Sequence, residues 1–204
     1  MSTWSILRAA GVGAYLMLFA AVAWGLVATT GLVSKRVAKA TSVLIHQVLG
    51  SVALALLVIH LGGLLLDEFA ELEPLDLLVP LREKKERPIG VALGVVGMYV
   101  LLIVLLTSWI RKGLGTSWWR RFHLFATPAF MLALMHGMVA GTDTKSPWMW
   151  WTYVATGLCV VFLLLVRALT GRGRRGGTEM RGREPSPPRE PAEEADPVGA
   201  GATS

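Results

Sequence analysis

Five long apolar runs constrain this chain more than any other feature of its sequence. They cover roughly residues 9–33, 41–66, 89–110, 122–141 and 147–168. A helix of about 20 residues crosses a hydrocarbon layer of ~30 Å, so each run is long enough to span a membrane. Lipid offers the backbone no hydrogen-bond partners, which predicts that each run is an α-helix. The sequence therefore predicts an all-α membrane protein, a five-span transmembrane helical bundle.

The composition supports a membrane protein and argues against a nucleic-acid-binding one. The chain is 53% hydrophobic and 17% charged, with a mean hydropathy of +0.54, which exceeds what a soluble domain needs for its core. Its net charge of +6 comes from residues at the ends of apolar runs and in the tail, so the charge favours a membrane surface over nucleic acid. The first run resembles a signal peptide but is about twice the usual length, so we interpret it as a span.

The chain divides into a membrane domain, residues 1–170, and a tail, residues 171–204. The tail is rich in Gly, Pro, Arg and Glu, and it has almost nothing to bury. This composition predicts a disordered segment.

The distribution of Lys and Arg predicts the orientation in the membrane. The side with the N-terminus and the 67–88 loop holds six basic residues, and the side with the tail holds fourteen. Positively charged loops stay in the cytoplasm. We therefore expect a multi-pass protein of the cell membrane with its N-terminus outside and its tail in the cytoplasm.

All four histidines of the chain lie in two apolar stretches. "HQVLGSVALALLVIH" begins with His46 and ends with His60, and "FHLFATPAFMLALMHGM" contains His123 and His136. Each helix therefore carries two histidines ~20 Å apart along its axis, one near each face of the membrane. The two runs cross the membrane in the same direction, which predicts that His46 pairs with His123 near the cytoplasmic face and His60 with His136 near the outer face.

Two neutral imidazoles across a helix bundle suit the axial positions of a low-spin haem iron, so the pairs predict two stacked haems. A structural zinc site needs three or four ligands at one point. The single cysteine, Cys159, excludes a c-type attachment within this chain, so any haem here is held non-covalently. In an ideal helix, His136 would lie ~140° from His123 in projection; the intervening Pro128 predicts a kink that changes this phase.

Small and cationic residues flank the histidines. The segment "TSWWRRFH" places Arg120 and Arg121 just before His123. These residues suit an interfacial belt of tryptophans and cations; alternatively, Arg120 or Arg121 pairs with haem propionates. Glycines close to the histidines fit a flat macrocycle lying against the helices, or serve helix packing alone. They are Gly50, Gly62, Gly63 and Gly137.

The spacing of the histidines and the "WWRRFH" motif resemble the ferric reductase-like transmembrane domain, which includes ferric reductases and NADPH oxidases. The resemblance covers about residues 10–168. It implies a di-haem b-type bundle that carries electrons across the membrane, with His46, His60, His123 and His136 as iron ligands. Members commonly have six spans, and complete reductases continue into a flavin and nicotinamide domain. This chain shows five spans and no Gly-rich phosphate loop.

We therefore expect the membrane cytochrome part of an oxidoreductase, with a flavin only through a partner. A cytoplasmic reductase or a quinol would supply electrons to it, and an unknown outer acceptor would receive them. No nucleophile or paired carboxylates suggest a catalytic residue of another kind. Two alternatives remain open from the sequence: a membrane anchor with structural histidines, and a proton or metal transporter that uses the intramembrane histidines.

Overall fold

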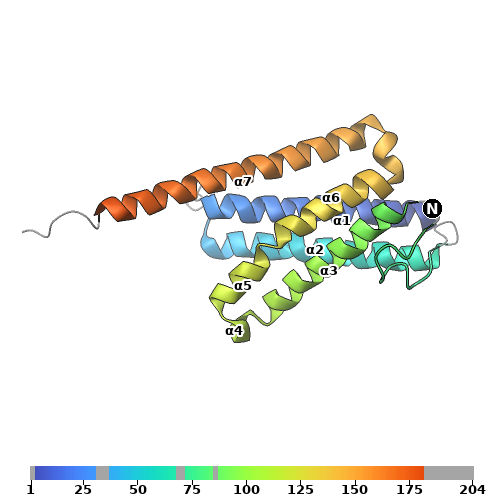
Figure 1. The fold of residues 1–204 in the computed structure, drawn as a ribbon, viewed down its shortest axis with the longest axis horizontal. Coiled ribbons are helices and arrows are strands. Elements are labelled where there is room, and N and C mark those ends of the chain that lie inside the picture. The colour runs from blue at the N-terminus through green and yellow to red at the C-terminus, as the bar shows by residue number, and fades with distance from the viewer. Residues whose placement is uncertain (1–2, 31–36, 68–71, 85–86, 182–204) are drawn as a thin grey trace, which may run out of the picture.

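The structure of the chain is a computed structural model that describes residues 3–30, 37–67, 72–84 and 87–181, the last stretch after residue 170 by its backbone alone. The described residues form helices joined by turns (Figure 1). In chain order these elements are α1 Thr3–Thr30, α2 Lys39–Leu66, α3 Pro88–Trp109, α4 Arg111–Leu114, α5 Thr116–His123, α6 Ala126–Ala140, the 3₁₀ helix η1 Thr142–Lys145, and α7 Pro147–Arg181.

Within the described part of the chain, five helical segments are long and apolar enough to cross a membrane, which confirms the all-α, five-span prediction. They are Trp4–Thr30, Lys39–Leu66, Pro88–Trp109, Thr116–Ala140 and Pro147–Thr170. The first helix begins earlier than the apolar run because it includes the turn around Arg8. The last helix, α7, continues to Arg181, beyond the apolar run. Of the tail predicted to be disordered, residues 182–204 lie outside the described part of the chain.

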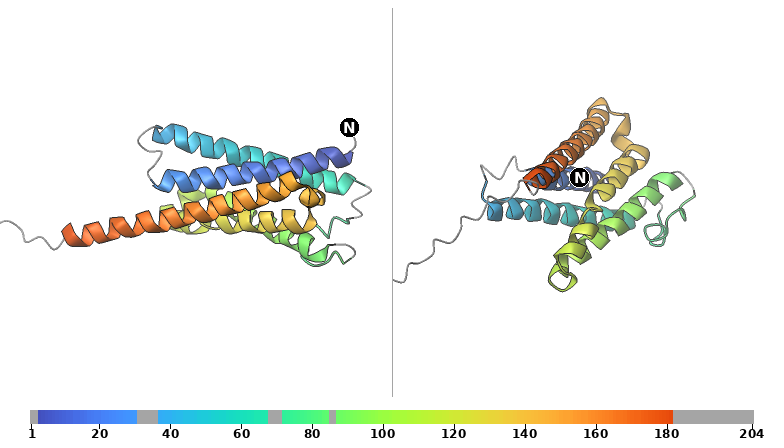
Figure 2. Two further views of the ribbon diagram at one scale, coloured as in Figure 1. Left: turned by 90° about the horizontal axis from the view of Figure 1, so that it is seen from above. Right: turned by 60° about the vertical axis from the view of Figure 1, so that its left-hand side comes forward.

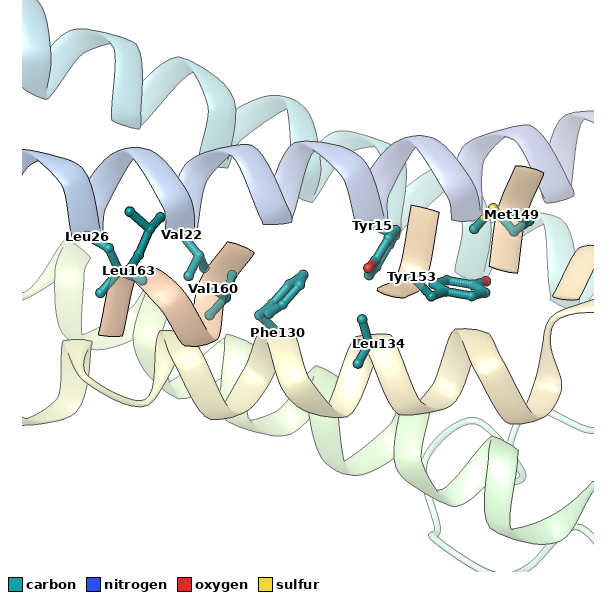
Figure 3. Close-up of a cluster of buried hydrophobic side chains, with 9 residues drawn as sticks. All are labelled: Tyr15, Val22, Leu26, Phe130, Leu134, Met149, Tyr153, Val160 and Leu163. Carbon is teal, nitrogen blue, oxygen red and sulfur yellow. The ribbon is translucent and has the colours of Figure 1, made fainter. Parts of the chain in front are cut away.

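The packed core of the bundle lies between α1, α6 and α7 (Figure 3). Its centre is Phe130 of α6, which is fully buried. The Phe130 ring stacks on Tyr15 of α1 with 5.7 Å between ring centroids. The hydroxyls of Tyr15 and Thr156 of α7 form a buried hydrogen bond, so neither of these two hydroxyls is left unpaired inside the bundle.

The other two spans flank this core. Helix α3 packs along α6, and small residues bring the two backbones close: a Cβ on Gly90 would lie 2.9 Å from the Cβ of Ala140. Helix α2 packs closely with α1 alone among the described helices, and α1 lies between α2 and α7 (Figure 2). In its most apolar window only 6% of α2 is buried, against 17–28% for the other spans. A face of α2 is therefore left without a helix packed on it.

The helices place the loops at two ends of the bundle (Figure 1). The N-terminal end contains the start of α1, the end of α2, the start of α3 and the end of α6. The α4 end, opposite to it, contains the end of α1, the start of α2, and α4 and α5. Because α2 and α6 both run from the α4 end to the N-terminal end, they cross the bundle in the same direction, as the sequence predicts.

The fourth span is interrupted directly after His123. Helix α5 ends there, residues 124–125 form a turn, and α6 begins at Ala126. The backbone tightens at this point, since the Phe125 amide donates to the Phe122 carbonyl at 3.0 Å. The ring of a helical proline clashes with the carbonyl four residues earlier, which for Pro128 is that of Leu124. The proline thus explains why the break falls here, and the break changes the phase between His123 and His136.

The core predicts a difference between two phenylalanine substitutions. Phe130→Ala removes a fully buried ring and leaves a cavity, so it should lower the free energy of unfolding by about 3 kcal/mol. Phe162→Ala, the control, truncates a ring of α7 that is 63% exposed toward the surroundings of the bundle. Thermal unfolding in detergent micelles measures both. Equal shifts of the two midpoints would contradict this assignment of the core.

Candidate functional site

The structure arranges the four histidines as two pairs, one toward each end of the bundle. Toward the α4 end, His46 of α2 and His123 of α5 have ring centroids 5.7 Å apart, with ring planes at 70°. Toward the N-terminal end, His60 of α2 and His136 of α6 line one cavity. The described residues contain no group of three or more His, Cys, Asp or Glu side chains that could hold a metal ion together. The possible metal ligands therefore come as histidine pairs.

This cavity has a volume of about 430 Å³ and is lined by residues of α1, α2, α3, α6 and α7. This value lies within the range of about 300–1,000 Å³ that is usual for cofactor and ligand sites. Apolar side chains line most of it, among them Leu57 of α2 and Met98 of α3. Polar residues gather where it reaches the N-terminal end, including Arg8, Arg87 and Asp143. The cavity thus combines an apolar body, two imidazoles and a charged mouth.

Three of the histidines form the same hydrogen bond with a neighbouring helix. The Nδ1 atom of His46 lies 3.0 Å from the Ala21 carbonyl of α1. The Nδ1 of His60 lies 3.1 Å from the carbonyl of Leu7, also in α1. On the other side of the bundle, the Nδ1 of His136 lies 2.7 Å from the Gly90 carbonyl of α3. Each ring is therefore held by a helix that carries no histidine.

These hydrogen bonds determine which ring nitrogen carries the proton. A carbonyl oxygen only accepts, so Nδ1 must be the donor in His46, His60 and His136. In a neutral imidazole the Nε2 then has a free lone pair, the form that ligates a metal. No hydrogen bond within the described part of the chain uses the Nε2 of these three rings. A main-chain carbonyl on the other nitrogen is also the usual support of a metal-ligating histidine.

The fourth histidine is held differently. The Nδ1 atom of His123 is buried and has no hydrogen-bond partner among the described residues. Its ring stacks on Trp119, one turn earlier, with 5.2 Å between centroids and 28° between planes. The indole nitrogen of Trp119 in turn donates to Ser108 of α3 at 3.3 Å. Stacking therefore positions the His123 ring, whereas hydrogen bonds position the other three.

Glycines of the neighbouring helices make room for the three hydrogen-bonded rings. A Cβ on Gly11 would lie 2.8 Å from Nδ1 of His60, and one on Gly94 would lie 2.7 Å from Nδ1 of His136. A Cβ on Gly25 would approach His46 to 3.4 Å, an ordinary contact. The sequence patterns described above do not single out these glycines. A signal was present, however, since thirteen residues separate Gly11 from Gly25, as they do His46 from His60.

The glycines singled out from the sequence have other surroundings. A Cβ on Gly50 or Gly62 would meet nothing within 4 Å, so both border open space. Gly63 packs against Leu7, and Gly137 packs against the Tyr153 ring. The last two glycines thus accommodate protein side chains, and only the first two leave room for a flat group.

Cationic side chains lie at both ends of the bundle. At the α4 end, Arg120 and Arg121 are exposed, and the Arg121 guanidinium lies 5.0 Å from the centre of the Trp118 ring, a cation–π contact. At the N-terminal end, Arg87 donates to the Ala140 carbonyl at 2.7 Å. Arg8 forms an ion pair with Asp143 of η1.

The segment after α2 covers the N-terminal end of the cavity. Its Leu77 and Glu83 side chains are buried and line the cavity. Arg82 fixes the turn by donating to Asp76 at 2.9 Å and to Glu73 at 2.7 Å. The hydrogen bond to Glu73 raises the pKa of the Arg82 guanidinium above its ordinary value, so this cation stays charged at any physiological pH.

Comparison with known proteins adds one finding. The family model described as "Ferric reductase like transmembrane component" matches residues 9–134. The matched segment contains His46, His60 and His123, and it ends two residues before His136. No curated protein and no solved structure matches the chain.

Proposed function

We propose that this chain, which belongs to the ferric reductase like transmembrane component family, carries electrons across the membrane through two b-type haems. The family is an oxidoreductase family, and its membrane domain implies electron transfer. His46 and His123 would hold one haem, and His60 and His136 the other. A haem iron, when bound, takes up and releases one electron. The observation that carries the proposal is the arrangement of the four histidines as two pairs, one toward each end of the bundle.

The geometry of the residues fits this cofactor in three respects. A metal about 2 Å from each of two imidazole nitrogens holds the ring centres ~6 Å apart, and the His46 and His123 centroids are separated by 5.7 Å. The Nε2 atoms of three histidines have lone pairs available. Finally, α2 and α6 are not closely packed together, and the space between them includes the cavity that His60 and His136 line.

The same features disfavour the two alternatives. Histidines with only a structural role need no shared cavity, and a hydrogen bond to a neighbouring helix already satisfies His60 and His136, the two that line it. A proton or metal path needs polar groups between the two pairs, whereas the residues between His46 and His60 on α2 are apolar except for Gln47 and Ser51, both exposed. Electron transfer needs no polar path between the two haems.

We further propose that the α4 end faces the cytoplasm, because the excess of Lys and Arg lies there. The His46 and His123 pair is then the inner pair, and the His60 and His136 pair is the outer pair. Electrons from a cytoplasmic reductase or a quinol would enter at the inner pair, beside Arg120 and Arg121. They would leave at the charged mouth beside Arg8 and Arg87, where an outer acceptor would receive them. The chain would use a flavin only through such a partner.

Alanine substitution of single histidines tests the ligand assignment. His60→Ala and His136→Ala should each remove the outer haem, and His46→Ala and His123→Ala the inner one, because each haem would then lose one of the two side chains that would hold it. Haem content should fall from two haems per chain to one. Gln47→Ala, an exposed neighbour of His46, is the control and should keep both. Full haem content after the loss of either pair would show that the ligands are elsewhere.

The nature of the donor gives a second prediction. Purified protein should be reduced by dithionite, which donates electrons without a dedicated site, and should not oxidise NADPH at a useful rate. Absorbance in the α band of b-type haem follows the reduction. Rapid reduction by NADPH without any added protein would contradict the proposal that a partner supplies the electrons.

Charge at the α4 end gives a third prediction. Reduced flavin mononucleotide is an anionic donor, and the exposed Arg120 and Arg121 should attract it. Replacement of both arginines by Glu should slow reduction of the haems several-fold at low salt. The effect should be smaller at high salt, because salt screens the interaction between exposed charges beyond ~10 Å at 0.1 M. Stopped-flow absorbance measures the rate. The control is Lys145→Glu, an exposed cation at the opposite end. An equal effect of both changes would place electron entry elsewhere.

A further inference from the structure

We propose that Gly11 and Gly94 are positioning residues for the outer haem ligands, each acting with the carbonyl four residues before it. The inference rests on the proposed function, because it concerns how the ligands are held. Each unit, here called a glycine–carbonyl site, consists of a carbonyl that accepts from a histidine Nδ1 and the glycine one turn later. The two units are Leu7 with Gly11, facing His60, and Gly90 with Gly94, facing His136.

Helix geometry explains why the second residue is glycine. In an α-helix the carbonyl of a residue accepts from the amide four residues later, and its second lone pair remains available. A side chain in a helix is tilted toward the N-terminus and covers the turn before it. A Cβ on the fourth residue therefore lies where a second donor must approach the carbonyl. The distances of 2.8 Å at Gly11 and 2.7 Å at Gly94 are too short for a real Cβ, so any other residue must displace the imidazole.

A third glycine–carbonyl site faces the inner ligand His46, but its glycine lies farther from the imidazole ring. It consists of the Ala21 carbonyl and Gly25, where an added Cβ would make an ordinary contact of 3.4 Å. Helices α1 and α2 run in opposite directions, and equal spacing of glycines on one and histidines on the other brings both pairs into register. This match shows that the two contacts on α1 are parts of one repeated arrangement.

His123, the fourth proposed ligand, faces no glycine–carbonyl site. On α3, thirteen residues after Gly94, stands Thr107, followed by Ser108. Their hydroxyls donate to the carbonyls of the preceding turn, Thr107 to Ile103 at 2.7 Å and Ser108 to Val104 at 2.7 Å. Side-chain hydroxyls thus take the acceptors that a histidine would use, and Nδ1 of His123 is left without a partner.

The outer pair therefore has a glycine–carbonyl site at both histidines, while the inner pair has one only at His46. Each glycine–carbonyl site sets the tautomer and the rotation of its ring, which determines how the ring meets the iron. The two haem sites should therefore respond differently to the same glycine-to-alanine change.

The experiment compares four Gly→Ala variants of the full chain in detergent. Gly11→Ala and Gly94→Ala add a Cβ that displaces an outer ligand. Gly25→Ala adds one that fits beside His46. Gly157→Ala is the matched control in the interior of α7, where a Cβ would contact only Leu134 at 3.7 Å. Haem content and the low-spin ferric signals in electron paramagnetic resonance spectra are recorded for each.

The expected result is selective. Gly11→Ala and Gly94→Ala should lose the outer haem, halving the haem content, or shift its low-spin signal, and should leave the inner signal unchanged. The intact inner haem shows that the variant has folded. Gly157→Ala should match the wild-type protein, and Gly25→Ala should leave the outer signal unchanged.

Two results would overturn the inference while leaving the proposed function intact: two unchanged haem signals in Gly11→Ala and Gly94→Ala, or the same change in all four variants. Wild-type protein without haem would instead overturn the proposed function.

Discussion

The hydrogen bond from a histidine Nδ1 to a main-chain carbonyl of the next helix is the interaction on which this site depends. It occurs three times, at His46, His60 and His136. The carbonyl can only accept, so the bond fixes the proton on Nδ1 and keeps the Nε2 lone pair free. In a lipid environment no water competes for the carbonyl, and the bond also ties one helix to another. One interaction therefore serves packing, ring orientation and ligand chemistry.

The architecture follows from this role of the helices. Helix α1 contributes one face to the core with α6 and α7, and another face to α2. Helix α3 supports α6 in the same way that α1 supports α2. Helix α2 packs on α1, and α6 packs on α3. Because each is supported by this neighbour, α2 and α6 can lie on either side of a cavity without packing against each other. The scarcely buried surface of α2 is the consequence of this arrangement.

Much of this structure could be predicted from the sequence because hydropathy and histidine spacing are local signals. Five spans follow from the lengths of apolar runs, and the equal direction of the two histidine-bearing helices follows from their order. The roles of Gly11 and Gly94 could not be predicted in the same way, since they depend on which helices are neighbours and at what register. Likewise, Pro128 predicts a disturbance of the fourth span, but the tight turn directly after His123 depends on local backbone hydrogen bonds. The helical extension of α7 to Arg181 has no apolar pattern that would predict it.

Electron transfer across a sealed bilayer tests the central claim most directly. Purified protein is reconstituted into vesicles that contain ferricyanide, and a reductant that cannot cross the bilayer is added outside. If the central claim holds, the trapped ferricyanide should lose its absorbance at a rate that increases with the amount of protein, because electrons pass through both histidine pairs. A rate no greater than that of protein-free vesicles, from a preparation that contains both haems, would contradict it.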